Sequence, residues 1–217
     1  MVNERYQLIV FDWDGTLSDS CGQILDHLQE SASELGLDTF DRLLARGLIG
    51  LNFTDIVLKL YPDIDNHSAL ELLQKYRFHH AKYSQEVKLF PHVRELLEKC
   101  RQADILLAIA TSCSTHGLRQ ALAESGLEDY FCHVRTADQC LAKPHPQMLM
   151  ELMEVCAVDS KNTLMLGDNL CDIQLANNAG VDAIGVDFGS GHGPALLNEG
   201  ARAVISEYTQ LETYCYL

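Results

Sequence analysis

The sequence predicts an α/β fold: a doubly wound parallel sheet with an all-helical domain inserted after its first strand. Short, continuous apolar runs recur along the chain, and each stops at a small or polar residue, as strands buried on both faces do. Between most of these runs, apolar residues recur at spacings of three and four, which is typical of helices. Strands that alternate with helices favour βαβ units and a parallel sheet with helices on both faces.

The first predicted strand covers residues 8–11 and ends at Asp12. Four later runs repeat this design, at residues 105–110, 163–166, 183–186 and 203–205. Helical patterns lie between them, beginning after Pro91, near Thr115 and near Met148. Because parallel strands share one carboxyl edge, we expect the polar residues that follow them to meet there, where ligands bind in such folds.

Residues 17–85 break this alternation, because their apolar residues follow helical spacing and give no convincing strand. One stripe is closed by Gly36, another ends before Pro62, and a third runs through Leu70 and Phe78. The prediction is a core formed by residues 1–16 and 86–217 and an inserted helical domain formed by residues 17–85. The chain is expected to rejoin the core near Leu89.

The chain of 217 residues carries a formal net charge of −15, with a pI of about 4.8. Such acidity repels phosphodiester backbones and anionic lipid, so we expect neither nucleic acid nor a membrane as a partner. The first residues are polar, and no run approaches the roughly 20 apolar residues of a membrane span, which predicts a cytoplasmic protein. A phosphate substrate would require a local cation. The oligomeric state is left open.

The eight cysteines include no Cys-x-x-Cys pair and no zinc-like spacing. In a reducing cytoplasm we interpret them as buried apolar residues or free thiols. Cys113 and Cys171 adjoin the polar motifs described next, and whether they confer redox sensitivity stays open at this point.

Two pairs of acids follow predicted strands. Asp12 and Asp14 stand two residues apart with Gly15 behind them, so their side chains can share one site as nucleophile and acid/base, or as metal ligands. Asp168 and Asp172 stand four apart at the start of a predicted helix, on one helical face. A solvated turn and a capped helix would explain either pair alone. Paired acids at two strand ends of one sheet favour a site.

Hydroxyl groups and one lysine complete the candidate set. Thr111 and Ser112 close the second strand before a helix N-terminus, an arrangement that suits a phosphate as well as a simple helix cap. Lys143 lies between Ala142 and Pro144, and this proline-stiffened loop suits a lysine aimed at a site rather than a solvated surface charge.

Four segments in order resemble the motifs of the haloacid dehalogenase superfamily: residues 12–17, Thr111, residues 143–146 and residues 167–172. With residues 90–91 and 176–180, the chain is similar to the phosphoglycolate phosphatase group, which carries a helical cap after the first motif. Asn169 departs from the threonine frequent at its position in that group, and His92 departs from a frequent glycine.

The resemblance implies a phosphatase acting on a small phosphorylated metabolite. It implies that Asp12 is the nucleophile, that Asp14 is the general acid/base, and that Thr111, Ser112 and Lys143 bind phosphate. Mg²⁺ would be held by Asp12, Asp14 and Asp168, with Asp172 supporting them from behind. The acid at Asp14 favours phosphoryl transfer over carbon–halogen cleavage.

The inserted helical domain would then cover the active edge and select the leaving group. Arg46 resembles a cap residue that contacts substrate, although an arginine at a helix C-terminus before Gly47 needs no such role. Three alternatives remain: a phosphosugar mutase of the same superfamily, a phospho-accepting signalling domain, and a catalytically silent binding module.

Overall fold

The computed structural model describes residues 6–83 and 87–215. Six parallel strands form one sheet in the order β3-β2-β1-β4-β5-β6. They are β1 (Leu8–Phe11), β2 (Leu106–Thr111), β3 (His133–Thr136), β4 (Thr163–Gly167), β5 (Asp182–Val186) and β6 (Ala203–Ile205). The predicted α/β fold class is confirmed, and five of these strands match the predicted apolar runs closely.

Strand β3 was not predicted, because its sequence does not form an apolar run. Its residues are His133, Val134, Arg135 and Thr136, and only the last of them is buried. The strand lies at the edge of the sheet and pairs only with β2 among the described strands, so solvent reaches much of it. An edge position does not require the continuous hydrophobic sequence of a central parallel strand.

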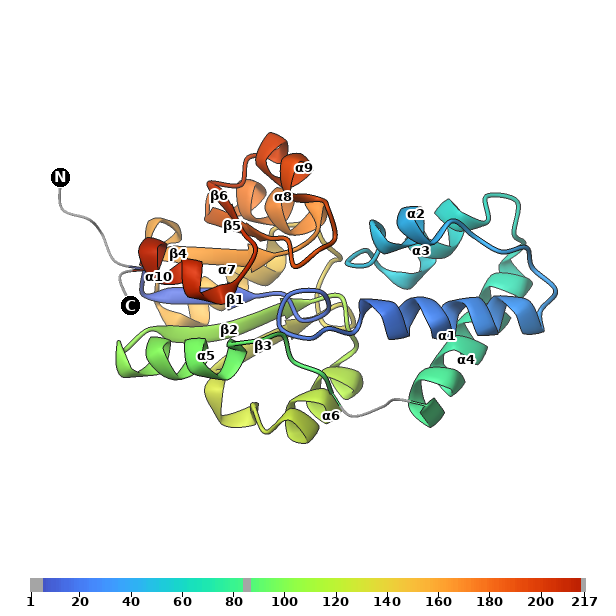
Figure 1. Cartoon of the computed structure of the whole chain (residues 1–217), viewed down its shortest axis with the longest axis horizontal. Coiled ribbons are helices and arrows are strands. Elements are labelled where there is room, and N and C mark those ends of the chain that lie inside the picture. The colour runs from blue at the N-terminus through green and yellow to red at the C-terminus, as the bar shows by residue number, and fades with distance from the viewer. Residues whose placement is uncertain (1–5, 84–86, 216–217) are drawn as a thin grey trace.

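Helices cover both faces of the sheet (Figure 1). The alternation of strand β1 explains this, because Ile9 and Phe11 point to one face while Leu8 and Val10 point to the other. The first face packs against α5 (Val93–Gln102), α6 (Thr115–Ser125), η3 (Tyr208–Leu211) and α10 (Glu212–Cys215). The second packs against α7 (Gln147–Cys156), α8 (Leu170–Ala179) and α9 (Gly193–Glu199). Short helical turns η1 (Glu128–Tyr130) and η2 (Ser160–Asn162) lead into β3 and β4.

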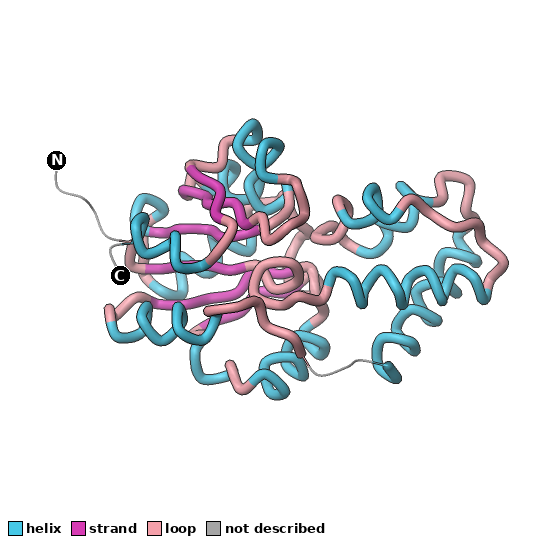
Figure 2. The backbone as a smooth tube through the Cα atoms, in the orientation of Figure 1, coloured by secondary structure: helices cyan, strands magenta, loops and turns pink. Residues whose placement is uncertain are grey.

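Between β1 and α5 the described chain forms four helices and contributes no strand to the sheet (Figure 2). They are α1 (Cys21–Glu34), α2 (Arg42–Arg46), α3 (Phe53–Leu60) and α4 (Asn66–Tyr83). These four helices, called the cap helices below, lie beyond the carboxyl ends of the strands (Figure 1). The predicted end of the inserted domain, Gln85, lies outside the described residues, and the domain division stays a prediction.

The chain leaves the sheet and returns to it along neighbouring paths. Ser18 forms an isolated antiparallel bridge with Leu89. On either side of it, the Asp19 amide donates to the Lys88 carbonyl at 2.7 Å and the Phe90 amide donates to the Leu17 carbonyl at 3.0 Å. The outgoing and returning segments are therefore paired, close to the predicted point of return. Of the helices in residues 6–83 and 87–215, none has the length and apolar character needed to cross a bilayer.

Candidate active site

The predicted acids meet at the carboxyl edge of the sheet. Strands β1 and β4 are neighbours, with Phe11 in register with Leu166, so Asp12 and Asp168 follow adjacent strand ends. The Asp12 amide donates to the Leu166 carbonyl at 2.9 Å, which extends the pairing to the nucleophile candidate. Carboxylate oxygens of Asp12, Asp168 and Asp172 all lie within 4.8 Å of one another. One compact acidic cluster results.

Lys143 is buried at the centre of this cluster. Its ammonium nitrogen donates to Asp12 Oδ1 and to Asp172 Oδ1, at 2.7 Å each. Burial alone would lower the pKa of this amine, but the carboxylates of Asp12 and Asp172 raise it above its ordinary value. Lys143 is therefore a fixed positive charge beside Asp12.

Asp172 holds Lys143 from behind. Its second oxygen, Oδ2, accepts the Asn169 backbone amide at 3.1 Å, while the Asn169 side chain caps the same helix, α8. Both oxygens of Asp172 are thus engaged within the protein. The supporting role of Asp172 stays a prediction.

Asp14 occupies a different environment from Asp12. It accepts hydrogen bonds from Ser20 Oγ at 2.5 Å and from Cys113 Sγ at 2.8 Å. Burial raises the pKa of the Asp14 carboxyl, and the nearby charge of Asp12 raises it further. The two acids at the end of β1 therefore differ in their partners, which are Lys143 for Asp12 and Ser20 and Cys113 for Asp14.

Asp168 lies close behind the first turn after β1. Its Oδ1 accepts the Thr16 hydroxyl at 3.0 Å. Gly15 has φ +84°, and a Cβ at that position would lie 2.2 Å from Asp168 Oδ2, so only glycine fits. Burial, Asp12 and Asp172 all raise the pKa of Asp168 well above its usual value. Crowded carboxylate oxygens of this kind suit a divalent cation, which would relieve their mutual repulsion.

Thr111 and Ser112 follow β2 but differ in their surroundings. Thr111 is buried, and its hydroxyl accepts the Cys113 amide at 3.2 Å. The Ser112 hydroxyl donates to the carbonyl of Gly50, in the loop that follows α2. Thr111 is therefore buried at the carboxyl edge of the sheet, whereas Ser112 connects the core to the loop between α2 and α3.

Asn169 makes a second connection to the same loop. Its Nδ2 donates to the Gly47 carbonyl at 2.8 Å and to the Ile49 carbonyl at 2.7 Å. A Cβ on Gly50 would lie 3.1 Å from Cys171 Sγ and 3.2 Å from Asn169 Cβ, which explains a glycine in this close approach. The departure from the common threonine at Asn169 thus supplies a contact between core and cap.

Arg46 ends α2 next to this loop and is partly buried. Burial raises the pKa of the Cys21 thiol, Asp168 and Asp14 raise it further, and Arg46 lowers it. Arg46 directly precedes Gly47, whose carbonyl accepts Asn169 Nδ2, so it adjoins the cap loop that contacts the core.

Helix α4 brings two rings toward Asp14 that the sequence did not single out. Burial raises the pKa of Tyr76, and Asp14 raises it further, while His80 lowers the pKa of Asp14. The rings of Tyr76 and His80 are stacked, with centroids 5.8 Å apart. Among the described residues His80 Nδ1 has no hydrogen-bond partner. The spacing of four on one helix was the only signal that could have found this pair.

Of the two thiols whose redox role was left open, Cys171 is buried and Cys113 is partly buried. Burial and Asp14 raise the pKa of Cys113, and burial and Asp172 raise that of Cys171, each well above the ordinary thiol value. Burial and a neighbouring carboxylate both favour the protonated thiol over the reactive thiolate. Cys113 serves here as a hydrogen-bond donor to Asp14.

Residues 9–186 match the family model described as haloacid dehalogenase-like hydrolase. The chain belongs to this family. The resemblance read from the four motifs is confirmed, and with it the prediction that the chain is an enzyme, a hydrolase.

Curated relatives and solved structures agree with this membership. A phosphoglycolate phosphatase of Vibrio parahaemolyticus is 30% identical over 90% of this chain and 90% of its own length. One from Vibrio vulnificus is 28% identical with the same coverage. The crystal structure of a predicted phosphatase from Clostridium acetobutylicum is 25% identical, covers 98% of this chain and 99% of its own, and has a TM-score of 0.86.

Proposed function

We propose that the protein is a Mg²⁺-dependent phosphatase that hydrolyses a small phosphorylated metabolite through an aspartyl phosphate on Asp12. One observation carries the proposal: Lys143 is buried between Asp12 and Asp172, with Asp168 in the same cluster. A fixed cation beside a carboxylate nucleophile suits a reaction in which a negatively charged phosphoryl group must approach Asp12.

The residues divide the reaction between them. Asp12 attacks phosphorus in line with the leaving oxygen, and Asp14 protonates that oxygen as the bond breaks. Asp14, then ionised, takes a proton from the water that hydrolyses the aspartyl phosphate. Lys143 and Thr111 hold the phosphoryl oxygens, and Ser112 supports the same edge while joined to the cap.

The raised pKa of Asp14 supports its part in this scheme. Partly buried and bonded to Ser20 and Cys113, it can carry a proton at a pH where an exposed aspartate would not. Asp172 takes no direct part and keeps Lys143 in position. Mg²⁺ would be held by the carboxylates of Asp12 and Asp168 and the backbone carbonyl of Asp14, where it would offset phosphate charge.

The cap helices select the substrate in this proposal. Arg46 ends α2 beside the loop that is bonded to Asn169, and His80 lies on α4, where its ring stacks on Tyr76. A guanidinium suits a carboxylate on the leaving group. Together with the names of the curated relatives, this favours 2-phosphoglycolate. The strongly acidic surface argues against nucleic acid and membrane partners, and eight free cysteines suit the cytoplasm.

Release of inorganic phosphate from a panel of phosphorylated metabolites, with and without Mg²⁺, tests the proposal. The wild type should release phosphate only with the metal, and Asp12→Asn should lower the rate at least about 10³-fold. Asp159→Asn, which changes an exposed acid before η2, is the matched control and should keep full activity.

Three results would count against this function. Folded, metal-loaded wild type that releases no phosphate from any compound would overturn it. Isomerisation of a phosphosugar without net phosphate release would identify a mutase. A phosphorylated Asp12 that persists for hours would instead fit a signalling domain.

A further inference from the structure

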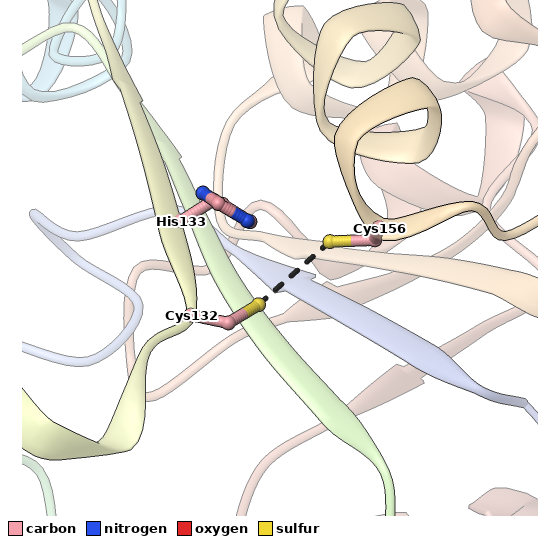
Figure 3. A group of neighbouring side chains, drawn as sticks. All are labelled: Cys132, His133 and Cys156. Carbon is pink, nitrogen blue, oxygen red and sulfur yellow. Dashed lines mark hydrogen bonds between the residues drawn. The ribbon is translucent and has the colours of Figure 1, made fainter.

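Two cysteines and a histidine meet at the edge of the sheet opposite the acidic cluster. Cys132 and His133 stand at the amino end of β3, and Cys156 is the last residue of α7. The Cys132 amide donates to the carbonyl of Leu107, near the amino end of β2. Figure 3 shows the three side chains gathered between β3 and the end of α7. This Cys132–His133–Cys156 group is called the amino-edge cluster below.

The distance between the two sulfur atoms of the amino-edge cluster matches a tetrahedral metal site, and the histidine lies close to both. The two sulfur atoms are 3.7 Å apart, and one ring nitrogen of His133 lies within 4.8 Å of both. Zinc binds thiolate sulfur at about 2.3 Å, and a tetrahedral angle then separates two such sulfurs by about 3.8 Å. The sulfur atoms thus already have the spacing of two ligands of one ion. A disulfide, at about 2.05 Å, would require them to move much closer.

The ligand types and their surroundings favour zinc over the cations that suit the acidic cluster. Two sulfurs and an imidazole form the soft and borderline donor set that Zn²⁺ prefers, whereas Mg²⁺ requires oxygen. Cys132 is exposed, so an ion can enter from solvent. Cys156 ends a helix of ten residues, where the partial negative charge of the helix C-terminus favours a cation. The nearby Arg135 is paired with Glu151 at 2.6 Å, which offsets its charge.

We propose that Cys132, His133 and Cys156 bind one Zn²⁺, with a water molecule as the fourth ligand. On binding, both thiols lose their protons to solvent and the ion is held by two thiolates and the neutral imidazole. The sulfur of Cys132, which donates to the Leu107 carbonyl at 3.1 Å, gives up this hydrogen bond. The ion fastens the edge strand β3 to the end of α7, on the far side of the sheet from the catalytic acids.

Cobalt provides a direct test, because thiolate ligands give tetrahedral Co²⁺ a charge-transfer band that oxygen ligands do not. Reduced full-length protein is titrated with Co²⁺ without oxygen, and the absorbance is followed. We expect the band to saturate at one equivalent and to disappear when Zn²⁺ is added. Co²⁺ in the acidic cluster contributes no such band, so the two sites are distinguished even when both fill.

Matched variants assign the band to these residues. Cys132→Ser and Cys156→Ser should each lower zinc affinity at least about 100-fold, since even partners outside the ligand set change affinity 10- to 100-fold. Cys140→Ser, a partly buried cysteine outside the cluster, and His67→Ala, an exposed histidine, should bind zinc as the wild type does. His133→Ala keeps both thiols and should weaken binding while the band shifts.

A second readout protects the test against a variant that fails to fold. Zn²⁺ should raise the midpoint of thermal unfolding of the wild type and of Cys140→Ser, but not that of Cys156→Ser. Absence of the charge-transfer band in reduced wild type overturns the proposal. A band that persists in Cys132→Ser, or zinc uptake that stops only when Asp168 is changed, overturns it equally.

Discussion

The sheet and the cap helices are built in different ways. The sheet is buried on both faces, and each face has one large apolar cluster formed by strands and covering helices together. The cap helices share two small clusters, one around Leu25 and Ile49 and one around Leu28 and Leu72. Leu43 and Leu70 are 78% and 60% exposed there. The cap has much less apolar burial to fix its shape.

Polar groups follow the same division. In the core, Lys143, Asp12 and Asp172 are fully paired and buried. In the cap, His27 and His80 meet edge to face at 5.6 Å, and a ring nitrogen of each has no hydrogen-bond partner among the described residues. The candidate catalytic groups are thus held by ion pairs at the sheet, whereas the candidate specificity groups stand on helices with less apolar packing.

After Asp12→Asn, the largest effect on activity should come from Asp14→Asn. This change keeps the shape of the side chain and removes its proton transfer, so kcat should fall about 10³-fold. Because burial raises the pKa of Asp14, its ionisation opposes folding at neutral pH, and the variant should be no less stable than the wild type. Steady-state kinetics and urea unfolding measure both. A variant that loses stability in step with activity would show that Asp14 is structural.

Lys143→Met should lower both the stability and the activity of the protein. It leaves two buried carboxylates without their cation, so the free energy of unfolding should fall by about 3 kcal/mol and activity about 100-fold. The control is Lys99→Met, whose pair with Glu212 is partly exposed and should contribute less than about 1 kcal/mol. Denaturant unfolding compares the two. An equal loss of unfolding free energy in both variants would mean that the buried ion pairs of Lys143 stabilise the protein no more than the partly exposed pair does.

Asn169→Ser tests the connection between core and cap. Serine still caps α8, but the hydrogen bonds to the Gly47 and Ile49 carbonyls are lost, at about 1 kcal/mol each. We expect KM to rise about 10-fold while kcat changes little. Asn177→Ala, on the same helix but bonded to the Glu199 carbonyl, should leave KM unchanged. A fall in kcat alone would place Asn169 in the chemistry instead.

The smallest effect should be a pH response of the cap. Burial lowers the pKa of His27, and His80 and His79 lower it further, against the opposing charges of Glu30 and Asp26. In the unfolded chain a histidine titrates near about 6.5, so below that pH protons favour unfolding. The contribution of neutral His27 to folding stability is fully present above the pKa of the unfolded chain. It is lost as pH falls toward the lowered pKa of the folded protein.

Hydrogen exchange can locate this response. As pH falls from about 7.5 to about 5.5, protection of α1 and α4 should decrease more than that of β1. The difference should shrink in His27→Phe and persist in His67→Ala. Equal loss of protection in sheet and cap would contradict a response confined to the cap.

How much the sequence could predict depended on how local each signal is. The central strands were predictable because burial on both faces requires apolar residues throughout, and Asp12 and Asp168 were predictable because they follow such strands directly. Strand β3 was not predicted because an edge position tolerates polar residues such as His133 and Arg135. Lys143 follows no predicted strand, and only the prolines near it singled it out. Its pairing with Asp12 and Asp172 became visible only in the folded structure.

Contacts between distant segments carried no sequence signal. Cys132 and Cys156 are 24 residues apart and meet only because α7 packs beside β3. His80 lowers the pKa of Asp14, 66 residues away in the chain, and no local pattern indicates this. Ser112 was expected to bind phosphate, a prediction that stands untested. The fold adds its bond to the Gly50 carbonyl, which no reading of neighbouring residues would reveal.

The paired segments around Ser18 and Leu89 constrain how the two regions can move. A single connecting chain would let the cap swivel about any axis, but two backbones joined by hydrogen bonds form a ribbon that bends more readily than it twists. Ser20, just beyond this ribbon, donates to Asp14. The hydrogen bond to Asp14, the proposed general acid/base, and the connection between core and cap therefore lie within one short stretch of chain, so we expect motion of the cap to act on that bond.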